Sequence, residues 1–482
     1  MSTNWDALVK AYDIRGLVDV DLTEDVVQAL GAAFADELAL ECESLVIGHD
    51  MRDSSPRFAA AFARGATARG ANVIQLGLCS TDQTYFVSGS LGLPSAMFTA
   101  SHNPARYNGI KLTRSEARAI SLETGLASIR DRAQAYLEHG ISPVALVGGV
   151  SEYDSLTEYA SYLRSMVNLD SIRPLRVVID AANGMAGHSA LAVLGESAGL
   201  AALPIEILPL YFELDGNFPN HEANPLVAEN LRDLQAAVVA QKADLGLAFD
   251  GDADRCFVVD ELGNPVSPST VAAIVARVEI DRAKALGEQN VTVLYGHLAS
   301  RMLADSIRSA GARASKTKVG HSLIKAQMLG ENAVFGAEHS AHYYFRDFWF
   351  ADSGLLAAMH FMKALGESQG SASELAHEFA PYPGSGEINL QVADVAQALE
   401  RVKTAFGAGA VIDEFDGVTF GSSAWALGRA SEAPSAASSD PEWWWFNLRS
   451  SNTEPLLRFN AEAASQAQLE KIIAGVLAVI QS

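Results

Sequence analysis

The segment 99–104, Thr-Ala-Ser-His-Asn-Pro, holds a hydroxyl where it could react. It follows an apolar run over residues 93–98 that predicts a buried strand, and Pro104 cannot continue such a strand. Ser101 and His102 are therefore expected on a strand-to-loop turn, with the Ser101 hydroxyl as a candidate nucleophile. The alternative is an ordinary polar turn, which serines in such loops form more often.

The segment 250–255, Asp-Gly-Asp-Ala-Asp-Arg, predicts a metal site. Its alternating carboxylates are those of Asp250, Asp252 and Asp254. In an extended segment they would project to one side, and Gly251 would let the backbone curl around one ion. Unpaired, these groups repel one another, and an all-oxygen ligand set favours Mg²⁺ or Mn²⁺. A solvated acidic turn is the main alternative. An EF-hand is disfavoured because Arg255 stands where that loop needs glycine and both flanks predict strands.

The segment 336–342 offers groups that suit sugar recognition. Glu338 can accept hydrogen bonds from paired hydroxyls, while Ser340 and His342 can donate them. A zinc site is the alternative, although it would need cysteine or more closely placed ligands. Upstream, Lys318 and His321 stand at a predicted strand-to-helix turn. This histidine is either a site residue that titrates near neutrality or a satisfied structural histidine.

Two further segments carry arginines. Arg449 begins the segment 449–455 and is followed by the small donors Ser451, Asn452 and Thr453. The guanidinium and these donors could bind a phosphate. A helix cap is the alternative there. Near the start of the chain, Tyr12 and Arg15 precede a turn glycine. The alternative for them is an entry strand with a salt-bridged arginine.

Three similar stretches of chain must position these loops. Each begins with a Val/Ile/Leu-rich strand and a predicted helix: 45–48 with 56–69, 175–180 with 187–194, and 291–296 with 299–310. Each later contains a second buried strand that ends at a chemistry-bearing loop: 93–98, 245–249 and 333–335. Ligands of open α/β sheets bind beyond the carboxyl ends of the strands, so the three loops are expected to face one cleft.

Length and breaks in the pattern predict several domains among the 482 residues. The expected boundaries give domains at 1–150, 151–262, 263–380 and 381–482, with an Ala/Ser/Pro surface loop at 430–441 in the last.

A net charge of −23 argues against nucleic acid or an anionic membrane as partner. Three scattered cysteines, and the lack of a signal peptide or a long apolar run, suggest a cytoplasmic protein.

Taken together, the four motifs resemble those of the α-D-phosphohexomutase superfamily, in the bacterial phosphomannomutase/phosphoglucomutase branch. They occur in that family's order over nearly the whole chain: 99–104, 250–255, 336–342 and 449–455. The resemblance implies four domains around a central cleft. The first three would share a mixed α/β sheet topology, and the fourth would be a smaller α+β domain.

The resemblance also implies roles. Ser101 would be a phosphoserine and a ligand of one Mg²⁺ ion, together with Asp250, Asp252 and Asp254. The catalytic group would further include His102, Lys111, Arg255 and His321. Substrate would be bound by Tyr12, Arg15, Lys318, Glu338, Ser340, His342, Arg449, Ser451, Asn452 and Thr453. Relatives often carry a substrate lysine after the third domain's first strand; here His297 or Arg301 would have to replace it.

The implied activity is interconversion of mannose 1-phosphate and mannose 6-phosphate, with glucose phosphates as second substrates and a hexose 1,6-bisphosphate as intermediate and activator. The expected partners are small hexose phosphates, and the expected state is a monomer or weak homo-oligomer. The alternatives are a phosphoglucomutase or phosphoglucosamine mutase of the same superfamily, an aspartyl phosphatase that uses Asp250, and a non-catalytic sugar-phosphate-binding protein.

Overall fold

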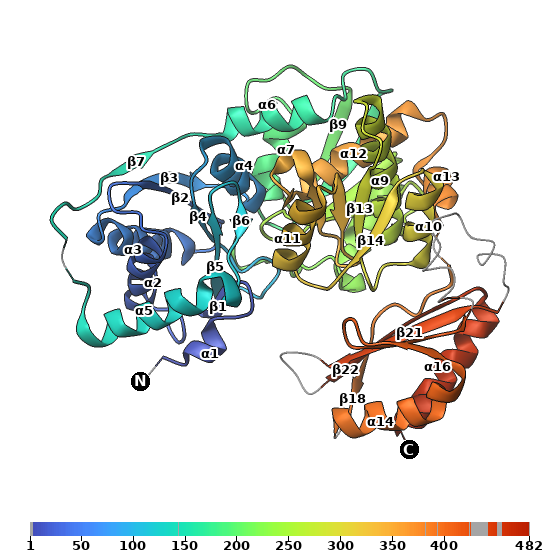
Figure 1. Ribbon diagram of the computed structural model, residues 1–482. Helices are drawn as coiled ribbons and strands as arrows, with labels where there is room; N and C mark the ends of the chain where they lie inside the picture. Colours follow the sequence, from blue (N-terminus) through green and yellow to red (C-terminus); the bar gives the residue numbers. More distant parts are fainter. Residues whose placement is uncertain are drawn as a thin grey trace.

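The computed structural model describes residues 3–142, 144–380, 382–392, 394–423, 425, 442–450 and 456–481. Within these residues the chain forms four sheets, each flanked by helices (Figure 1). The fold is α/β, with three similar mixed sheets followed by a smaller antiparallel one, as the sequence predicts.

The first domain is built on the sheet β1-β5-β4-β2-β3-β7, with β6 paired to β5. Its strands are Ile14–Leu17 (β1), Ser44–His49 (β2), Asn72–Leu78 (β3), Ser95–Phe98 (β4), Tyr107–Arg114 (β5), Arg118–Ala119 (β6) and Val150–Glu152 (β7). Its helices are Trp5–Leu8 (α1), Glu24–Glu37 (α2), Ser55–Ala68 (α3), Thr81–Leu91 (α4) and Leu126–His139 (α5). Helix α2 contacts both α3 and α5, and the three helices contribute to the apolar core of this domain.

The second domain contains the sheet β12-β11-β10-β8-β9. Its strands are Leu175–Asp180 (β8), Ile205–Leu210 (β9), Leu245–Phe249 (β10), Cys256–Asp260 (β11) and Pro265–Val266 (β12). Its helices are Leu156–Met166 (α6), Ala186–Val193 (α7) and Arg232–Gln241 (α8).

The third domain contains the sheet β14-β13-β15-β16-β17. Its strands are Thr292–Gly296 (β13), Arg313–Thr317 (β14), Phe335–Ala337 (β15), Tyr343–Phe345 (β16) and Ala351–Asp352 (β17). Its helices are Pro268–Ala285 (α9), Arg301–Ser309 (α10), His321–Glu331 (α11), Gly354–Glu367 (α12) and Ala372–Glu378 (α13). One continuous apolar cluster runs through the second and third domains.

These three sheets share one local order. In each sheet the first strand of the repeat (β2, β8 or β13) lies between two strands parallel to it. One of these two (β4, β10 or β15) also pairs with an antiparallel strand, which gives the orders β3-β2-β4-β5, β9-β8-β10-β11 and β14-β13-β15-β16. The predicted internal repeat is therefore confirmed. Strands β4, β10 and β15 are the equivalent strands, and their carboxyl ends carry the three chemistry-bearing loops.

The fourth domain is an antiparallel sheet in the order β18-β22-β21-β20-β19 with its own apolar core. Its strands are Ile388–Gln391 (β18), Val411–Asp413 (β19), Val418–Gly421 (β20), Trp444–Ser450 (β21) and Leu456–Ala463 (β22), and its helices are Val395–Phe406 (α14) and Gln466–Gln481 (α16). Figure 1 shows this domain, coloured orange to red, adjoining the third domain. The surface loop expected at 430–441 lies outside the described residues.

Candidate active site

The Ser101 hydroxyl lies at the carboxyl end of β4, where the first and second domains meet. Its Oγ donates to Asp250 Oδ2 at 2.7 Å, lies 3.1 Å from His102 Nδ1, and accepts from Arg255 Nη2 at 3.2 Å. Ser101 has a φ of 49°, in the left-handed region that residues with a side chain rarely adopt. The side chain is 5% exposed. A strained, buried hydroxyl held between a carboxylate and a guanidinium is typical of a functional position.

Three carboxylates gather beside this hydroxyl. One oxygen each of Asp250, Asp252 and Asp254 lies within 4.8 Å of the others, and all three side chains are buried. Lys111 on β5 donates to Asp252 at 2.7 Å and to Asp254 at 2.5 Å. Even so, Oδ1 of Asp252 and Oδ1 of Asp254 are buried without a hydrogen-bond partner.

The ionisation of these carboxylates follows from burial and from their neighbours. Burial, together with the charges of Asp254 and Asp252, raises the pKa of Asp250 to about 7, although Arg255 opposes the rise. Burial acts in the same sense on Asp252, but Lys111 outweighs it, so the pKa of Asp252 is lowered. Buried carboxylates with unpaired oxygens fit a hard divalent cation such as Mg²⁺, which would satisfy those oxygens and offset their repulsion.

The loop after β15 joins the same cluster from the third domain. His342 pairs with Arg255 through an isolated antiparallel bridge, so the loop after β15 is joined to the loop after β10. Its Nδ1 lies 3.0 Å from Asp352 Oδ2 and 3.8 Å from Asp254 Oδ1. Burial lowers the pKa of His342, but these two carboxylates outweigh it and raise the value above that of a free histidine. Asp352 is in turn paired with Lys325 at 2.8 Å.

Glu338 and His321 lie at a second point of contact between the first and third domains. The carboxylate of Glu338 accepts from the Gly320 backbone N–H at 3.0 Å and from the Tyr344 hydroxyl at 2.7 Å. His321 begins α11 and packs edge-on against the Tyr12 ring, 4.7 Å between centroids. Burial, reinforced by Lys325, lowers the pKa of His321 well below that of a free histidine, so its imidazole is neutral at pH 7.

Arginines face this region from the first and fourth domains. Arg15 donates to Asn103 at 2.5 Å and to Asp13 at 2.7 Å, which links β1 to the Ser101 loop. Arg449 lies near the end of β21. Burial raises the pKa of the Tyr12 phenol, while the charges of Arg15 and Arg449 oppose that rise. Arg449 of the fourth domain is therefore near enough to Tyr12 for its charge to act on the pKa of the phenol.

Four domains of one protein family match the chain in sequence. The models describe phosphoglucomutase/phosphomannomutase alpha/beta/alpha domains I, II and III and the C-terminal domain, and they match residues 6–139, 157–263, 267–382 and 387–479. The chain belongs to the phosphoglucomutase/phosphomannomutase family.

Relatives agree with this assignment over nearly the full length. A protein described as phosphohexose mutases from Xanthomonas campestris pv. campestris is 37% identical over 463 residues, covering 95% of this chain and 96% of the relative. A phosphomannomutase from Escherichia coli K12 is 34% identical over 465 residues, covering 95% of each. The crystal structure of a phosphoglucomutase/phosphomannomutase family protein from Burkholderia thailandensis superposes with a TM-score of 0.83 at 28% identity, covering 100% of this chain and 98% of that one. The protein is thus a phosphohexomutase, an enzyme of the isomerase class that acts on small sugar phosphates.

In this phosphohexomutase the loop predicted to bind metal differs from the expected extended segment. Residues 250–254 form a turn, with Ala253 at a φ of 64°, because β10 and β11 pair as a hairpin from Phe249 and Cys256 outward. Gly251 does not supply the left-handed curl; a Cβ there would lie 2.4 Å from the Ser101 carbonyl oxygen. Its role is to allow the two loops to approach, and the strands on either side exclude the EF-hand alternative.

The structure also bears on the zinc-site alternative for the segment 336–342 and on the remaining predicted substrate residues. His339 lies 3.4 Å from Ser269, whereas His342 faces Asp254 and Asp352, so the two histidines do not share a zinc site. Arg449 lies in β21, which pairs with β22 from Trp444 to Ser450. Ser451, Asn452 and Thr453 lie outside the described residues. Ser340 is half-buried, and the exposed Lys318 lies 5.6 Å over the Phe415 ring.

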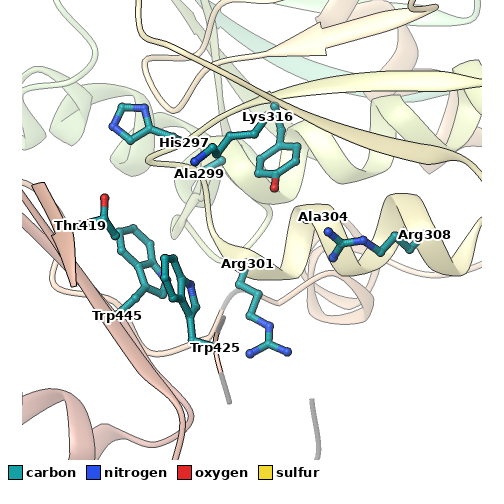
Figure 2. Close-up of a pocket in the computed structure, with 10 residues that line it drawn as sticks. His297, Ala299, Arg301, Ala304, Arg308, Lys316, Thr419, Trp425 and Trp445 are labelled. Atoms are coloured by element: carbon teal, nitrogen blue, oxygen red, sulfur yellow. The ribbon is translucent and has the colours of Figure 1, made fainter. Parts of the chain in front are cut away.

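Figure 2 shows a separate pocket between the third and fourth domains, lined in part by His297, Arg301 and Trp445. Its volume of about 40 Å³ is far below the roughly 300–1,000 Å³ of a ligand pocket. Burial lowers the pKa of His297 to about 4, so it is neutral, and the guanidinium of Arg301 stacks 4.8 Å over Trp443. Arg301 pairs with Asp305 through Nε at 3.3 Å, while its Nη1 and Nη2 are buried without a hydrogen-bond partner, and its replacement of a substrate lysine stays a prediction.

Several residues at the site were missed in the sequence, among them Asp352 and Lys325 beside His342, and Arg52. Arg52, four residues beyond the strand motif 45–48, is 1% exposed and donates to the loop that carries Ser101. The segment after that strand, Gly-His-Asp-Met-Arg, places a charged pair at the carboxyl end of a central parallel strand. That position could have identified it.

The described residues include no helix that is both long and apolar enough to cross a membrane.

Proposed function

We propose that the enzyme interconverts mannose 1-phosphate and mannose 6-phosphate, and that it also accepts glucose phosphates. The reaction would proceed through a phosphorylated Ser101 and a hexose 1,6-bisphosphate, which also serves as activator. The single observation that carries the proposal is the Ser101 Oγ, hydrogen-bonded to Asp250 and Arg255 at the centre of an acidic cluster. The choice of mannose is supported by the name of the Escherichia coli relative.

Each side chain of the cluster has a task in this scheme. Asp250, Asp252 and Asp254 hold one Mg²⁺, which neutralises charge on the phosphoserine when bound. Arg255 and Lys111 lie beside these aspartates and offset the charge that spreads over the phosphoryl oxygens during transfer. His102, whose pKa is lowered by burial and by Arg255, stays neutral beside the Ser101 oxygen.

The transfer breaks the bond between phosphorus and Ser101 Oγ and forms one between phosphorus and a sugar hydroxyl. The proton of that hydroxyl must leave, and the neutral imidazole of His321 is in the form that accepts it. Tyr12, Arg15, Lys318, Glu338, Ser340 and His342 bind the sugar, and Arg449 with Ser451, Asn452 and Thr453 binds the distal phosphate. The sugar then turns end over end and returns its other phosphoryl group to Ser101.

Replacing Ser101 by alanine tests the proposal. Ser101→Ala is expected to abolish turnover of mannose 1-phosphate, because the acceptor oxygen is gone, while binding of the sugar phosphate persists. A coupled assay gives the turnover, and calorimetric titration gives the binding. Ser165→Ala removes an exposed hydroxyl on α6 that bonds only locally, and it is the matched control. Equal turnover by Ser101→Ala and wild type contradicts the proposal.

The same assays separate the alternatives. Release of inorganic phosphate without isomerisation, with label on Asp250, would indicate a phosphatase. Binding without any conversion by the wild-type enzyme would indicate a binding protein. Relative rates on mannose, glucose and glucosamine 1-phosphates decide which mutase the enzyme is.

A further inference from the structure

The side chain of Arg52 is enclosed beneath the loop that carries Ser101. Its Nη1 and Nη2 atoms donate to four backbone carbonyls of one loop at 2.7–3.1 Å: those of Ser101, Asn103, Pro104 and Tyr107. Its Nε lies 3.3 Å from Asp50, which is also buried. Arg52 therefore contacts the loop through its backbone, whatever side chains the loop carries.

This arrangement compensates for the conformation of the loop. Ser101 has a left-handed φ of 49°, and its carbonyl and that of Asn103 accept from the Arg52 guanidinium. A planar guanidinium with five donors can satisfy several such carbonyls at once, whereas an ammonium is a compact group that lacks this fixed geometry. Removing the guanidinium takes the donor away from the buried Ser101 carbonyl and from the half-buried carbonyls of Asn103 and Tyr107, and lets the loop relax.

The second domain closes this arrangement from the other side. A Cβ at Gly216 would lie 2.6 Å from the Arg52 Cα, and the Phe218 ring lies 5.0 Å from its guanidinium. A Cβ at Gly251 would lie 2.4 Å from the Ser101 carbonyl oxygen, which is the same oxygen that accepts from Arg52. Arg52 and Gly251 of the loop after β10 thus both contact the Ser101 carbonyl.

We propose that Arg52 is a positioning residue for phosphoryl transfer, which holds the Ser101 Oγ in line with Asp250 and Arg255 by fixing the four carbonyls of its loop. The proposal rests on the proposed function, because it assigns Arg52 an effect on the Ser101 reaction. Its positive charge also lies below a side chain that gains nearly two negative charges on phosphorylation. Arg52 itself touches neither sugar nor metal in this scheme.

The test is Arg52→Lys, which keeps the charge but loses the fork of donors. The full-length Mg²⁺-loaded enzyme, activated with glucose 1,6-bisphosphate, is assayed on mannose 1-phosphate. We expect kcat to fall about 100-fold, since a shift near 1 Å in a reacting group has this effect, while KM stays within about twofold. Arg64→Lys, at a half-exposed arginine on α3 that pairs with Glu24, is the matched control and should leave both constants unchanged.

Two further measurements make the outcome specific. Hydrogen exchange should accelerate in Arg52→Lys at residues 99–108 and remain unchanged in α3 and in the fourth domain. Millimolar guanidinium should restore part of the turnover of Arg52→Ala and have no such effect on wild type. Unchanged kcat, a change confined to KM, or unchanged exchange at 99–108 would each overturn the proposal. If wild type itself lacks mutase turnover, the proposed function fails, and exchange at 99–108 still tests whether Arg52 holds the loop.

Discussion

The three aspartates beside Ser101 differ in their hydrogen-bond partners, and this difference sets the ionisation state of each carboxyl group. Asp250 accepts from Ser101 and Arg255, and burial among other carboxylates raises its pKa to about 7. Asp252 accepts from Lys111 and from the Thr81 hydroxyl at 2.6 Å, and its pKa is lowered. The ionised carboxylate of Asp252 therefore lies next to that of Asp250, which is protonated in part near pH 7. A bound cation would favour the ionised form of both.

Removal of the metal is therefore expected to abolish turnover. Chelation with EDTA should stop the mutase reaction, and added Mg²⁺ should restore it, because the repulsion among the carboxylates is then offset. Asp252→Asn should weaken the apparent affinity for Mg²⁺ by at least about tenfold, as loss of a ligand does more than loss of its hydrogen-bond support. A Mg²⁺ titration of the initial rate measures both.

The matched control for that titration is Asp281→Asn. Asp281 pairs with Arg277 on the exposed face of α9, and its loss should not change the Mg²⁺ dependence. Full activity of the wild type in excess EDTA would contradict a metal role for the aspartates.

Three helices of three domains meet at one buried carboxylate. Asp82 on α4 accepts from the Tyr159 hydroxyl of α6 at 2.7 Å and from Ser353, the N-cap of α12, at 2.6 Å. Ser80 donates to its other oxygen at 2.5 Å. Burial raises the pKa of Asp82 to about 6, even though these hydroxyls act to lower it. The first three domains are thus joined behind the site by hydrogen bonds to a single group.

Asp82 should make stability depend on pH in a direction opposite to that of most surface acids. Its folded pKa lies above the usual value of 3.8, so the folded state binds the proton more tightly than the unfolded chain. Its contribution to stability is present at low pH and is lost as the pH rises from the unfolded to the folded pKa. Between about pH 4.5 and 7.5 the loss is about 2 kcal/mol.

Asp82→Asn removes this titration. The unfolding temperature of the variant relative to wild type should therefore rise by a few degrees over that pH interval, which calorimetry measures. A difference between the two proteins that is constant with pH would show that Asp82 does not titrate in this range.

The loops that follow β4 and β10 approach each other closely. The turn after β10 can reach the Ser101 loop only because Gly251 has no side chain. Gly251→Ala should lower kcat about 100-fold, since the loops must separate by a fraction of an ångström or more, with the circular dichroism spectrum unchanged.

Gly330→Ala is the control for that substitution. Gly330 lies in α11 with open space around its would-be Cβ, so alanine there should stabilise by up to about 1 kcal/mol and leave kcat unaltered. Wild-type kcat for Gly251→Ala would show that the approach of the loops is not needed.

On the scale of the whole molecule, the described residues of the fourth domain contact the third through polar groups and through the stacking of Arg301 over the Trp443 ring. Lys316 pairs with Asp413 at 2.7 Å, and the Val319 backbone N–H donates to Asp416 at 3.0 Å. Glu462 of β22 accepts from the Ser300 hydroxyl and, at 2.9 Å, from the Arg301 backbone N–H. Segment 382–386 bonds along β22 and leads into β18. A domain held in this way is suited to move relative to its neighbour when substrate bridges them.

Substrate should therefore compact the molecule. Hexose 1,6-bisphosphate is expected to lower the radius of gyration measured by small-angle scattering, because Arg449 and the first three domains would then grip opposite ends of one ligand. Ser101→Ala should still compact, since it keeps the binding groups, whereas Arg449→Ala should not. Equal compaction of Arg449→Ala and wild type would contradict the role of the fourth domain. The domain boundaries at 150, 262 and 380 remain a prediction.

The sequence alone determined the four motifs, the repeated strand–helix pattern and the family, because residue types, spacing and periodicity are local properties. Thus Ser101, the aspartates and Glu338 could be named before any coordinates. Only the tertiary structure decided that 250–254 is a turn, that Gly251 serves contact between loops, and that Arg52 and Asp82 bear on the site. Those features depend on residues up to 271 positions apart in the chain, and no local pattern records which distant group a buried charge will meet.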